Sequence, residues 1–235
     1  MTESGVVVAE NARTVLERCA DAARRSGREP NDVTIVAVSK THPMAAIREA
    51  LGVGLRDFGE NRVQEAAEKW SGERAAGLRL HMVGRLQRNK ARPALELFDL
   101  IHSCDSVELA ERLSRLAGEV RGGCAEVLLE VNVSGEASKA GFAPRDVAES
   151  LDRLLALPDL RVRGLMTIAP AAESPEAARP YFVALRALSD RLRAKRTEMG
   201  GELSMGMTDD YEVAIEEGAT MVRIGRAIFG VRRPG

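Results

Sequence analysis

The stretch VTIVAVSKTHP, residues 33–43, joins a run of apolar and mostly β-branched residues to an abrupt polar end. The run does not alternate between apolar and polar side chains, which is typical of a parallel strand covered on both faces. Lys40 follows this strand directly, and His42 with Pro43 marks the start of the next helix. The stretch therefore predicts a buried strand that ends on an amine.

Seven further runs follow, and segments with helical periodicity separate them. Eight parallel strands alternating with helices are what a (β/α)8 TIM-like barrel requires. The competing architecture is an open, doubly wound sheet, but the G-x-G-x-x-G motif that usually follows its first strand is missing here. We therefore predict the barrel. The seven runs are RDFGE (56–60), LRLHMVG (78–84), FDLIHS (98–103), EVLLEVNV (126–133), RVRGLMTI (161–168), ELSMG (202–206) and TMVRIG (220–225).

Helix signals fill the intervening segments of this α/β pattern. Asp105 with Glu108, and Asp209 with Glu212, have the spacing of a capping box. An additional helix, roughly residues 7–25, is expected before the first strand. Because no linker or internal repeat interrupts the pattern, we expect residues 1–235 to form a single domain.

Composition excludes several classes of partner. The 34 basic and 35 acidic residues give a net charge of -1, so there is no electrostatic reason to expect nucleic acid or an anionic membrane. The three cysteines lack metal-ligand spacing and are expected as small buried side chains in a reducing compartment. The first residues include acids and only a four-residue apolar run, which is too short for a secretory signal, so we expect a cytoplasmic protein.

In such a barrel, polar groups at the carboxyl ends of the strands meet around one mouth, where the fold places its sites. Lys40 is the most informative of them. A strand-end lysine usually extends to solvent, but this one follows an inward-packed strand, and partial desolvation favours its neutral, nucleophilic form. Such an amine can form a Schiff base with an aldehyde. The other candidates are Asn61, Arg85 with Gln87, Lys139, Ser204, Arg223, Gly225 and Arg226.

The last two strands offer a complement to the amine. Gly225 ends the final strand, and a glycine there lets an anion approach backbone N–H groups; barrels often bind phosphate at this position. For the glycine alone an ordinary turn is the simpler interpretation, but Ser204 and Arg223 converge on the same region. An aldehyde-reactive amine that faces a phosphate pocket suggests pyridoxal 5′-phosphate (PLP).

Other polar residues have simpler explanations. His81 and His102 lie in apolar runs and are expected as core or lip histidines rather than metal ligands. Helix capping explains Asp209 and Asp210 better than magnesium binding does. The basic stretch at residues 84–93 fits either an anion site or a solvated helix start.

Six blocks, taken together and in order, resemble the pyridoxal phosphate homeostasis protein family, small relatives of the alanine racemase barrel domain. The resemblance implies a fold-type III barrel with PLP held as an imine on Lys40 and Arg223 facing the pyridine nitrogen. It further implies that Ser204, Gly225 and Arg226 bind the phosphate, that Asn61 lines the cofactor's other side, and that Met166 packs nearby. The blocks are AVSKTHP, FGENRVQEA, HMVGRLQRNK, GLMTIAP, LSMGMTDD and VRIGRAIFG, within residues 33–230.

The chain departs from the family pattern at two positions. Arg226 stands where the family usually has a small hydroxyl residue, so the guanidinium either adds charge to the phosphate site or turns outward. Thr208 stands where serine is common, which keeps the hydroxyl.

The resemblance implies a carrier that buffers PLP and delivers it to PLP-dependent apoenzymes, without strong turnover. The alternative is a racemase-like enzyme, but larger relatives use a tyrosine from a second domain, and Tyr181 and Tyr211 fall in predicted helices away from the mouth. A barrel enzyme for a phosphorylated sugar, with Lys40 as base or aldolase-type amine, is a third possibility. Without the second domain, a monomer is expected.

Overall fold

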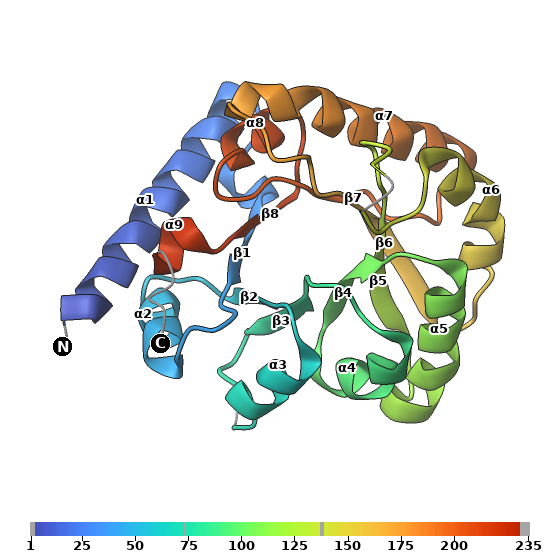
Figure 1. The fold of residues 1–235 in the computed structure, drawn as a ribbon, viewed down its shortest axis with the longest axis horizontal. Coiled ribbons are helices and arrows are strands. Elements are labelled where there is room, and N and C mark those ends of the chain that lie inside the picture. Colours follow the sequence, from blue (N-terminus) through green and yellow to red (C-terminus); the bar gives the residue numbers. More distant parts are fainter. Residues whose placement is uncertain (1–2, 73, 137–138, 231–235) are drawn as a thin grey trace.

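The computed structural model describes residues 3–72, 74–136 and 139–230. Within these ranges eight parallel strands pair in chain order, and β1 pairs with β8 to close a barrel. Helices surround the strands as an outer ring (Figure 1). The predicted (β/α)8 barrel is therefore confirmed. The strands are β1 (Thr34–Val38), β2 (Asp57–Glu60), β3 (Arg79–Met82), β4 (Leu100–Cys104), β5 (Ala125–Glu130), β6 (Leu160–Met166), β7 (Glu202–Ser204) and β8 (Met221–Ile224).

The helices follow the strands in the order that the sequence pattern predicts. The additional N-terminal helix is confirmed as α1, and it begins earlier than expected, at Glu3. It packs on α2, α8 and α9 along one side of the barrel (Figure 1). The helices are α1 (Glu3–Arg25), α2 (Met44–Gly52), α3 (Val63–Lys69), α4 (Ala91–Leu97), α5 (Val107–Arg121), α6 (Pro144–Leu155), α7 (Arg179–Lys195), α8 (Tyr211–Glu216) and α9 (Arg226–Phe229), with 3-10 helices η1 (Pro30–Asp32), η2 (Arg88–Lys90) and η3 (Pro175–Ala178).

Both predicted capping boxes were wrong by one residue. The N-cap of α5 is Ser106, and the N-cap of α8 is Asp210. The carboxylate of Asp210 accepts a hydrogen bond from the Met207 backbone N–H at 2.6 Å, so it braces the preceding turn rather than the helix. Asp209 forms an ion pair with Arg226 instead of capping α8.

The hydrophobic core has two layers. The main cluster fills the space between the strands and the outer helices. Two smaller clusters, made of alternate strand residues on the opposite face, occupy the barrel interior. Their members are Val36, Val38 and Val83 in one cluster, and Leu100, Leu128, Met166 and Met221 in the other.

The structure tests the expected burial of the three cysteines and shows the length and composition of the helices. Cys19 and Cys104 are buried as predicted, whereas Cys124 is half-buried, because it lies before β5 at the barrel's base. None of the helices in the described part of the chain combines the length and apolar character that a membrane crossing requires.

Candidate functional site

Lys40 lies two residues beyond β1, in a segment that buried polar contacts hold in place. The Ser39 hydroxyl donates a hydrogen bond to Glu60 Oε1 at 2.8 Å, and the Ser39 carbonyl accepts one from Lys69 Nζ at 2.8 Å. Thr41 has a left-handed φ of 64°, which is uncommon for a residue other than glycine. Its N–H donates to Glu65 on α3. The backbone on both sides of Lys40 is therefore fixed by contacts to β2 and α3.

Glu60 is the centre of this support, and sequence reasoning missed it. Its side chain is fully buried, and Oε1 also accepts hydrogen bonds from Lys69 Nζ at 2.9 Å and Trp70 Nε1 at 3.2 Å. A buried carboxylate needs such partners to offset its desolvation. The available signal was an acidic residue at the end of an otherwise apolar strand.

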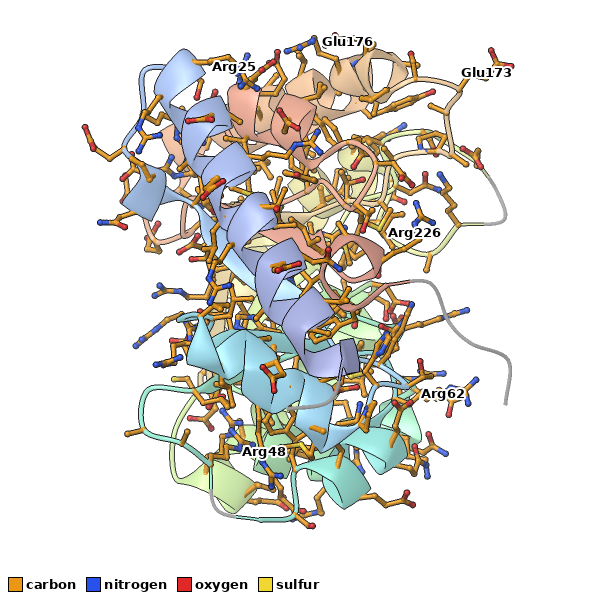
Figure 2. All side chains as sticks on the ribbon, turned by 90° about the vertical axis from the view of Figure 1, so that its left-hand side faces the viewer. Arg25, Arg48, Arg62, Glu173, Glu176 and Arg226 are labelled. Carbon is orange, nitrogen blue, oxygen red and sulfur yellow. The ribbon has the colours of Figure 1, made fainter. Side chains whose placement is uncertain are left out.

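Lys40 lines a cavity of about 560 Å³ at the carboxyl ends of the strands. Five of the six predicted cofactor-binding residues share this cavity, and Ser204 is the exception. Figure 2 shows that Arg62 and Arg226 project from the same side of the molecule, after β2 and β8 respectively. The lining residues are Val38, Lys40, His42, Asn61, Val83, Ile168, Met207, Thr208, Asp209, Arg223, Gly225, Arg226 and Gly230.

Arg223 forms the inner wall of the cavity and is only 4% exposed. Its Nη1 donates a hydrogen bond to Ser204 Oγ at 2.6 Å, and its Nη2 donates one to the Thr167 carbonyl at 2.8 Å. Burial lowers the pKa of Arg223 to about 10, opposed by the negative charges of Glu130 and Asp210. The guanidinium therefore remains cationic at neutral pH.

Ser204 ends β7, as predicted, and its assignment to the phosphate stays a prediction. Its side chain is buried in the barrel interior, where Oγ accepts from Arg223 and lies 2.8 Å from His102 Nδ1. Because the hydroxyl is engaged behind the guanidinium and Ser204 does not line the cavity, this arrangement does not support a direct phosphate contact. Thr208, whose hydroxyl sequence reasoning noted but left out of the site, lines the cavity and accepts a hydrogen bond from the Ala227 N–H at 3.4 Å.

Gly225 and Arg226 follow β8, which pairs with β1, and both line the cavity. A Cβ on Gly225 would lie 3.2 Å from the Val38 carbonyl oxygen, so the close approach of β8 and β1 favours glycine here. The Arg226 guanidinium turns toward Asp209, with Nη2 2.6 Å from Oδ2. The ion pair directs the Arg226 guanidinium toward Asp209, which also lines the cavity.

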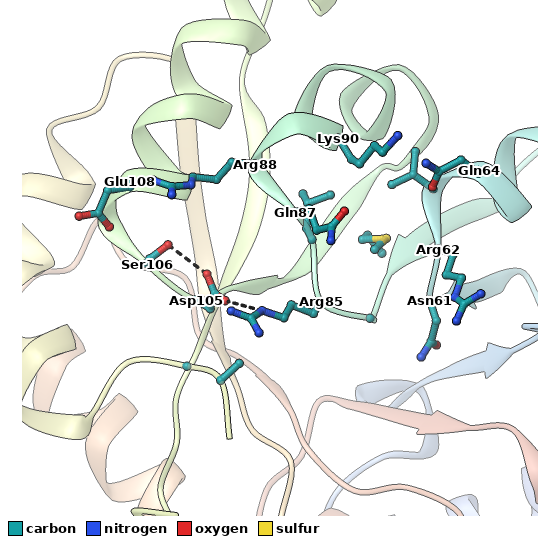
Figure 3. Close-up of a pocket in the computed structure, with 16 residues that line it drawn as sticks. Asn61, Arg62, Gln64, Arg85, Gln87, Arg88, Lys90, Asp105, Ser106 and Glu108 are labelled. Atoms are coloured by element: carbon teal, nitrogen blue, oxygen red, sulfur yellow. Dashed lines mark hydrogen bonds and ion pairs between the residues drawn. The ribbon is translucent and has the colours of Figure 1, made fainter. Parts of the chain in front are cut away.

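The other predicted residues lie in neighbouring hollows. Arg85 and Gln87 line a larger, mostly polar hollow of about 1200 Å³, shown in Figure 3, in which Arg85 pairs with Asp105 at 3.6 Å. Asn61 borders both this hollow and the cavity of Lys40. Lys139 lines a third hollow of about 280 Å³, with Nζ 3.1 Å from Glu136 Oε1.

The remaining expectations concern histidines, tyrosines and Met166. His81 and His102 are fully buried, as predicted, and hydrogen-bonded to each other. Tyr181 and Tyr211 lie in α7 and α8, and neither lines the cavity.

Met166 belongs to the apolar cluster of the barrel interior, together with Leu100, Leu128 and Met221. In the described residues no group of three or more histidine, cysteine or acidic side chains could hold a metal ion.

Comparison with known proteins identifies close relatives over nearly the full chain. A family model described as alanine racemase, N-terminal domain, matches residues 11–233. The pyridoxal phosphate homeostasis protein of Aquifex aeolicus (strain VF5) is 44% identical over 224 residues, covering 95% of this chain and 98% of the relative. The protein of the same name from Pseudomonas aeruginosa is 46% identical over 230 residues, covering 97% of each.

Solved structures agree with these sequence comparisons. PipY of Synechococcus elongatus PCC7942, solved with PLP bound, is 41% identical with a TM-score of 0.82, covering 95% of this chain and 100% of that one. An alanine racemase from Clostridium difficile 630 is 15% identical with a TM-score of 0.74, covering 96% of this chain and 58% of that one. At that identity the likeness extends to the fold alone.

Proposed function

Because the chain belongs to the pyridoxal phosphate homeostasis proteins of the alanine racemase N-terminal domain family, we propose that it binds PLP and serves in cytoplasmic PLP homeostasis. The observation that carries this proposal is the shared cavity of Lys40 and Arg223 at the barrel mouth. A volume of about 560 Å³ lies within the usual range for small-ligand sites. The PLP-bound PipY structure supports the same cofactor.

The donors around the cavity fit the functional groups of this cofactor. PLP supplies an aldehyde that amines capture and a ring that accepts electron density. We assign Lys40 as the anchor, since its amine can condense with the aldehyde, releasing water, to give a Schiff base. The backbone at Gly225, the hydroxyl of Thr208 and the Arg226 guanidinium are the proposed phosphate partners.

Arg223 favours storage of the cofactor over catalysis. We assign its remaining N–H groups to the pyridine nitrogen, which then faces a permanent cation. A cation at that position disfavours protonation of the nitrogen and weakens the ring as an electron sink. Among the residues that the structure describes, neither Tyr181 nor Tyr211 lines the cavity, where a racemase would need its second acid/base. We therefore propose a carrier that buffers PLP and releases it to PLP-dependent apoenzymes.

Lys40→Ala tests the anchor directly. Protein loaded with PLP and reduced with borohydride should carry one covalent adduct, which peptide mass spectrometry locates at Lys40. We expect Lys40→Ala to lose this adduct because no amine is left at that position. Lys90→Ala and Lys195→Met, which remove amines from the neighbouring hollow and from the exposed end of α7, are the controls and should retain it. An adduct of unchanged stoichiometry in Lys40→Ala would show that another residue is the anchor.

A further inference from the structure

Five polar side chains form a continuous hydrogen-bonded chain through the barrel interior. Asp57 Oδ1 lies 2.9 Å from His81 Nε2, and His81 Nδ1 lies 2.9 Å from His102 Nε2. His102 Nδ1 lies 2.8 Å from Ser204 Oγ, which accepts a hydrogen bond from Arg223 Nη1 at 2.6 Å. We call these residues the interior relay. It uses strands β2, β3, β4, β7 and β8, so it crosses the barrel.

The interior relay connects the base of the barrel to the cavity. Asp57 is the first residue of β2, at the end opposite the mouth, and its side chain is 19% exposed beside Arg79. Arg223 lines the cavity. The middle members are fully buried in a region that barrels usually fill with branched apolar side chains. A buried polar chain is costly unless every member is satisfied.

The chemistry of the two ends fixes the direction of every hydrogen bond. A carboxylate can only accept, so His81 donates to Asp57 from Nε2 and accepts at Nδ1. His102 then donates from Nε2 and accepts at Nδ1 from the Ser204 hydroxyl. A guanidinium can only donate, and the oxygen of Ser204 accepts from it. All donors therefore point from Arg223 toward Asp57, with both imidazoles neutral and protonated at Nε2.

A charged imidazole would break this pattern. If His81 carried two protons, His102 would have to accept at Nε2 and donate from Nδ1, leaving the Ser204 hydrogen without its acceptor. Burial lowers the pKa of His102 well below its ordinary value, and the positive charge of Arg223 acts in the same direction. The neutral, uniformly directed form is the one that satisfies all five groups.

The interior relay supplies one of the two fixed points of the Arg223 guanidinium. The other is the Thr167 carbonyl, which accepts from Nη2 at 2.8 Å. Two acceptors define the plane of the guanidinium and so the direction of the N–H groups that remain for the cavity. With its hydrogen directed to His102, the Ser204 hydroxyl presents its lone pairs to Arg223 Nη1, so the His102 contact sets how the hydroxyl is oriented toward the guanidinium.

We propose that Asp57, His81 and His102 are positioning residues that set the donor geometry of Arg223 toward the cofactor. They act through the hydroxyl of Ser204 and touch nothing in the cavity. The consequence for PLP rests on the proposed function, whereas the orientation of the guanidinium does not.

Three variants test the proposal, two at Asp57, at the base of the relay, and one at Ser204, beside Arg223. Asp57→Leu removes the acceptor at the base, and Asp57→Asn keeps an acceptor oxygen of similar shape without the charge. Glu126→Leu is the matched control. Glu126 is also a carboxylate near the start of a strand, β5, but it forms its ion pair with Arg161, outside the relay. Ser204→Ala breaks the relay by removing the hydroxyl that joins His102 to Arg223. If Asp57→Leu fails to fold, this variant shows whether the relay orients the Arg223 guanidinium.

Two readouts separate this inference from the proposed function. The first is the nitrogen-15 spectrum of cofactor-free protein, which distinguishes protonated from unprotonated ring nitrogens and also reports the Arg223 guanidinium. The chain has only three histidines, and His42 serves as an internal reference. The second readout is the affinity for PLP.

In wild type, Glu126→Leu and Asp57→Asn we expect both buried imidazoles as Nε2–H forms. In Asp57→Leu we expect the Nδ1–H form of His102 to appear, the Arg223 signals to shift, and PLP affinity to fall about tenfold, the effect of one lost charge-assisted hydrogen bond. Wild-type spectra and wild-type affinity in Asp57→Leu, or in Ser204→Ala, would overturn the relay. If wild-type protein binds no PLP, the proposed function fails, and the imidazole and guanidinium signals still decide the relay.

Discussion

Glu130 ends β5 beside the cavity, in the hollow that also contains Asn61 and Ile168. Burial raises the pKa of its carboxyl to about 7, and the charge of Asp105 adds to the effect, while Arg223 and Arg85 oppose it. The folded protein therefore holds a proton on Glu130 under conditions in which the unfolded chain has lost it. This single side chain links stability to pH near neutrality.

Glu130→Gln should remove that link. Because the folded pKa is raised, the contribution of Glu130 is present in full below its unfolded pKa near 4.5 and is lost as pH rises through about 7. Between these values we expect the free energy of unfolding of the wild type to fall by about 3 kcal/mol relative to Glu130→Gln. Urea denaturation of both proteins between pH 4.5 and 8 measures the difference, and parallel curves would contradict it.

The sequence predicted where single residues lie in the barrel, but it did not predict their hydrogen-bond partners. The end of an apolar run located Lys40, Asn61, Arg223 and Gly225 at the mouth, since strand ends meet there by the geometry of the fold. Periodicity says nothing about which hydroxyl a guanidinium will use. The phosphate assignment of Ser204 rested on its strand position and on the family resemblance. Its contact with His102 could not be foreseen, because the two residues are 102 positions apart in the chain.

At the scale of elements, α3 holds the segment that carries Lys40. Lys69, in its last turn, is 9% exposed and reaches the carbonyl of Ser39 as well as the carboxylate of Glu60. Glu65 on the same helix accepts the Thr41 N–H. The helix therefore acts on the site through backbone contacts rather than through the cavity wall.

Lys69→Met should destabilise the protein and loosen the Lys40 segment together. Losing one partner of a buried ion pair leaves Glu60 as an uncompensated charge, which costs about 3 kcal/mol. Lys195→Met, at an exposed position near the end of α7, is the control and should have little effect. Chemical denaturation measures stability, and amide hydrogen exchange at Thr41 measures the segment. Equal behaviour of the two variants would count against this role of α3.

Elements were the most predictable level of this structure. Each of the eight runs predicted as strands contains a strand, because burial on both faces demands an unbroken apolar pattern. The helix starts were less accurate, since an aspartate near a helix start has other uses. Asp209 pairs with Arg226 and Asp210 binds the Met207 N–H, so sequence spacing alone placed the cap one residue early.

The whole molecule presents a surface covered with charged side chains, as the view onto α1 illustrates (Figure 2). In the described ranges the exposed large apolar residues are few and dispersed, and two of them, Ile168 and Met207, belong to the cavity. Stable dimers of identical chains usually bury an apolar patch at their interface. We therefore expect a single chain in solution.

Sedimentation equilibrium should return the mass of one chain across a wide range of protein concentration, with and without PLP. The reason is that no apolar area of the size needed for a stable interface is present in the described residues. A mass that rises toward that of two chains at working concentrations would contradict the expectation. The exposed Ile168 and Met207 at the cavity would then be the first residues to test as an interface.

Helix α1 has a consequence for how the protein is made. Its ion pairs and hydrogen bonds reach α8, with Arg18 and Arg25 joined to Glu212 across 194 and 187 positions of sequence. Synthesis proceeds from the amino terminus, so α2 leaves the ribosome soon after α1, whereas α8 and α9 emerge near the end of the barrel. The part of α1 that packs on α8 and α9 must therefore stay unburied while most of the barrel is made. We expect a nascent-chain chaperone to act on this part of α1.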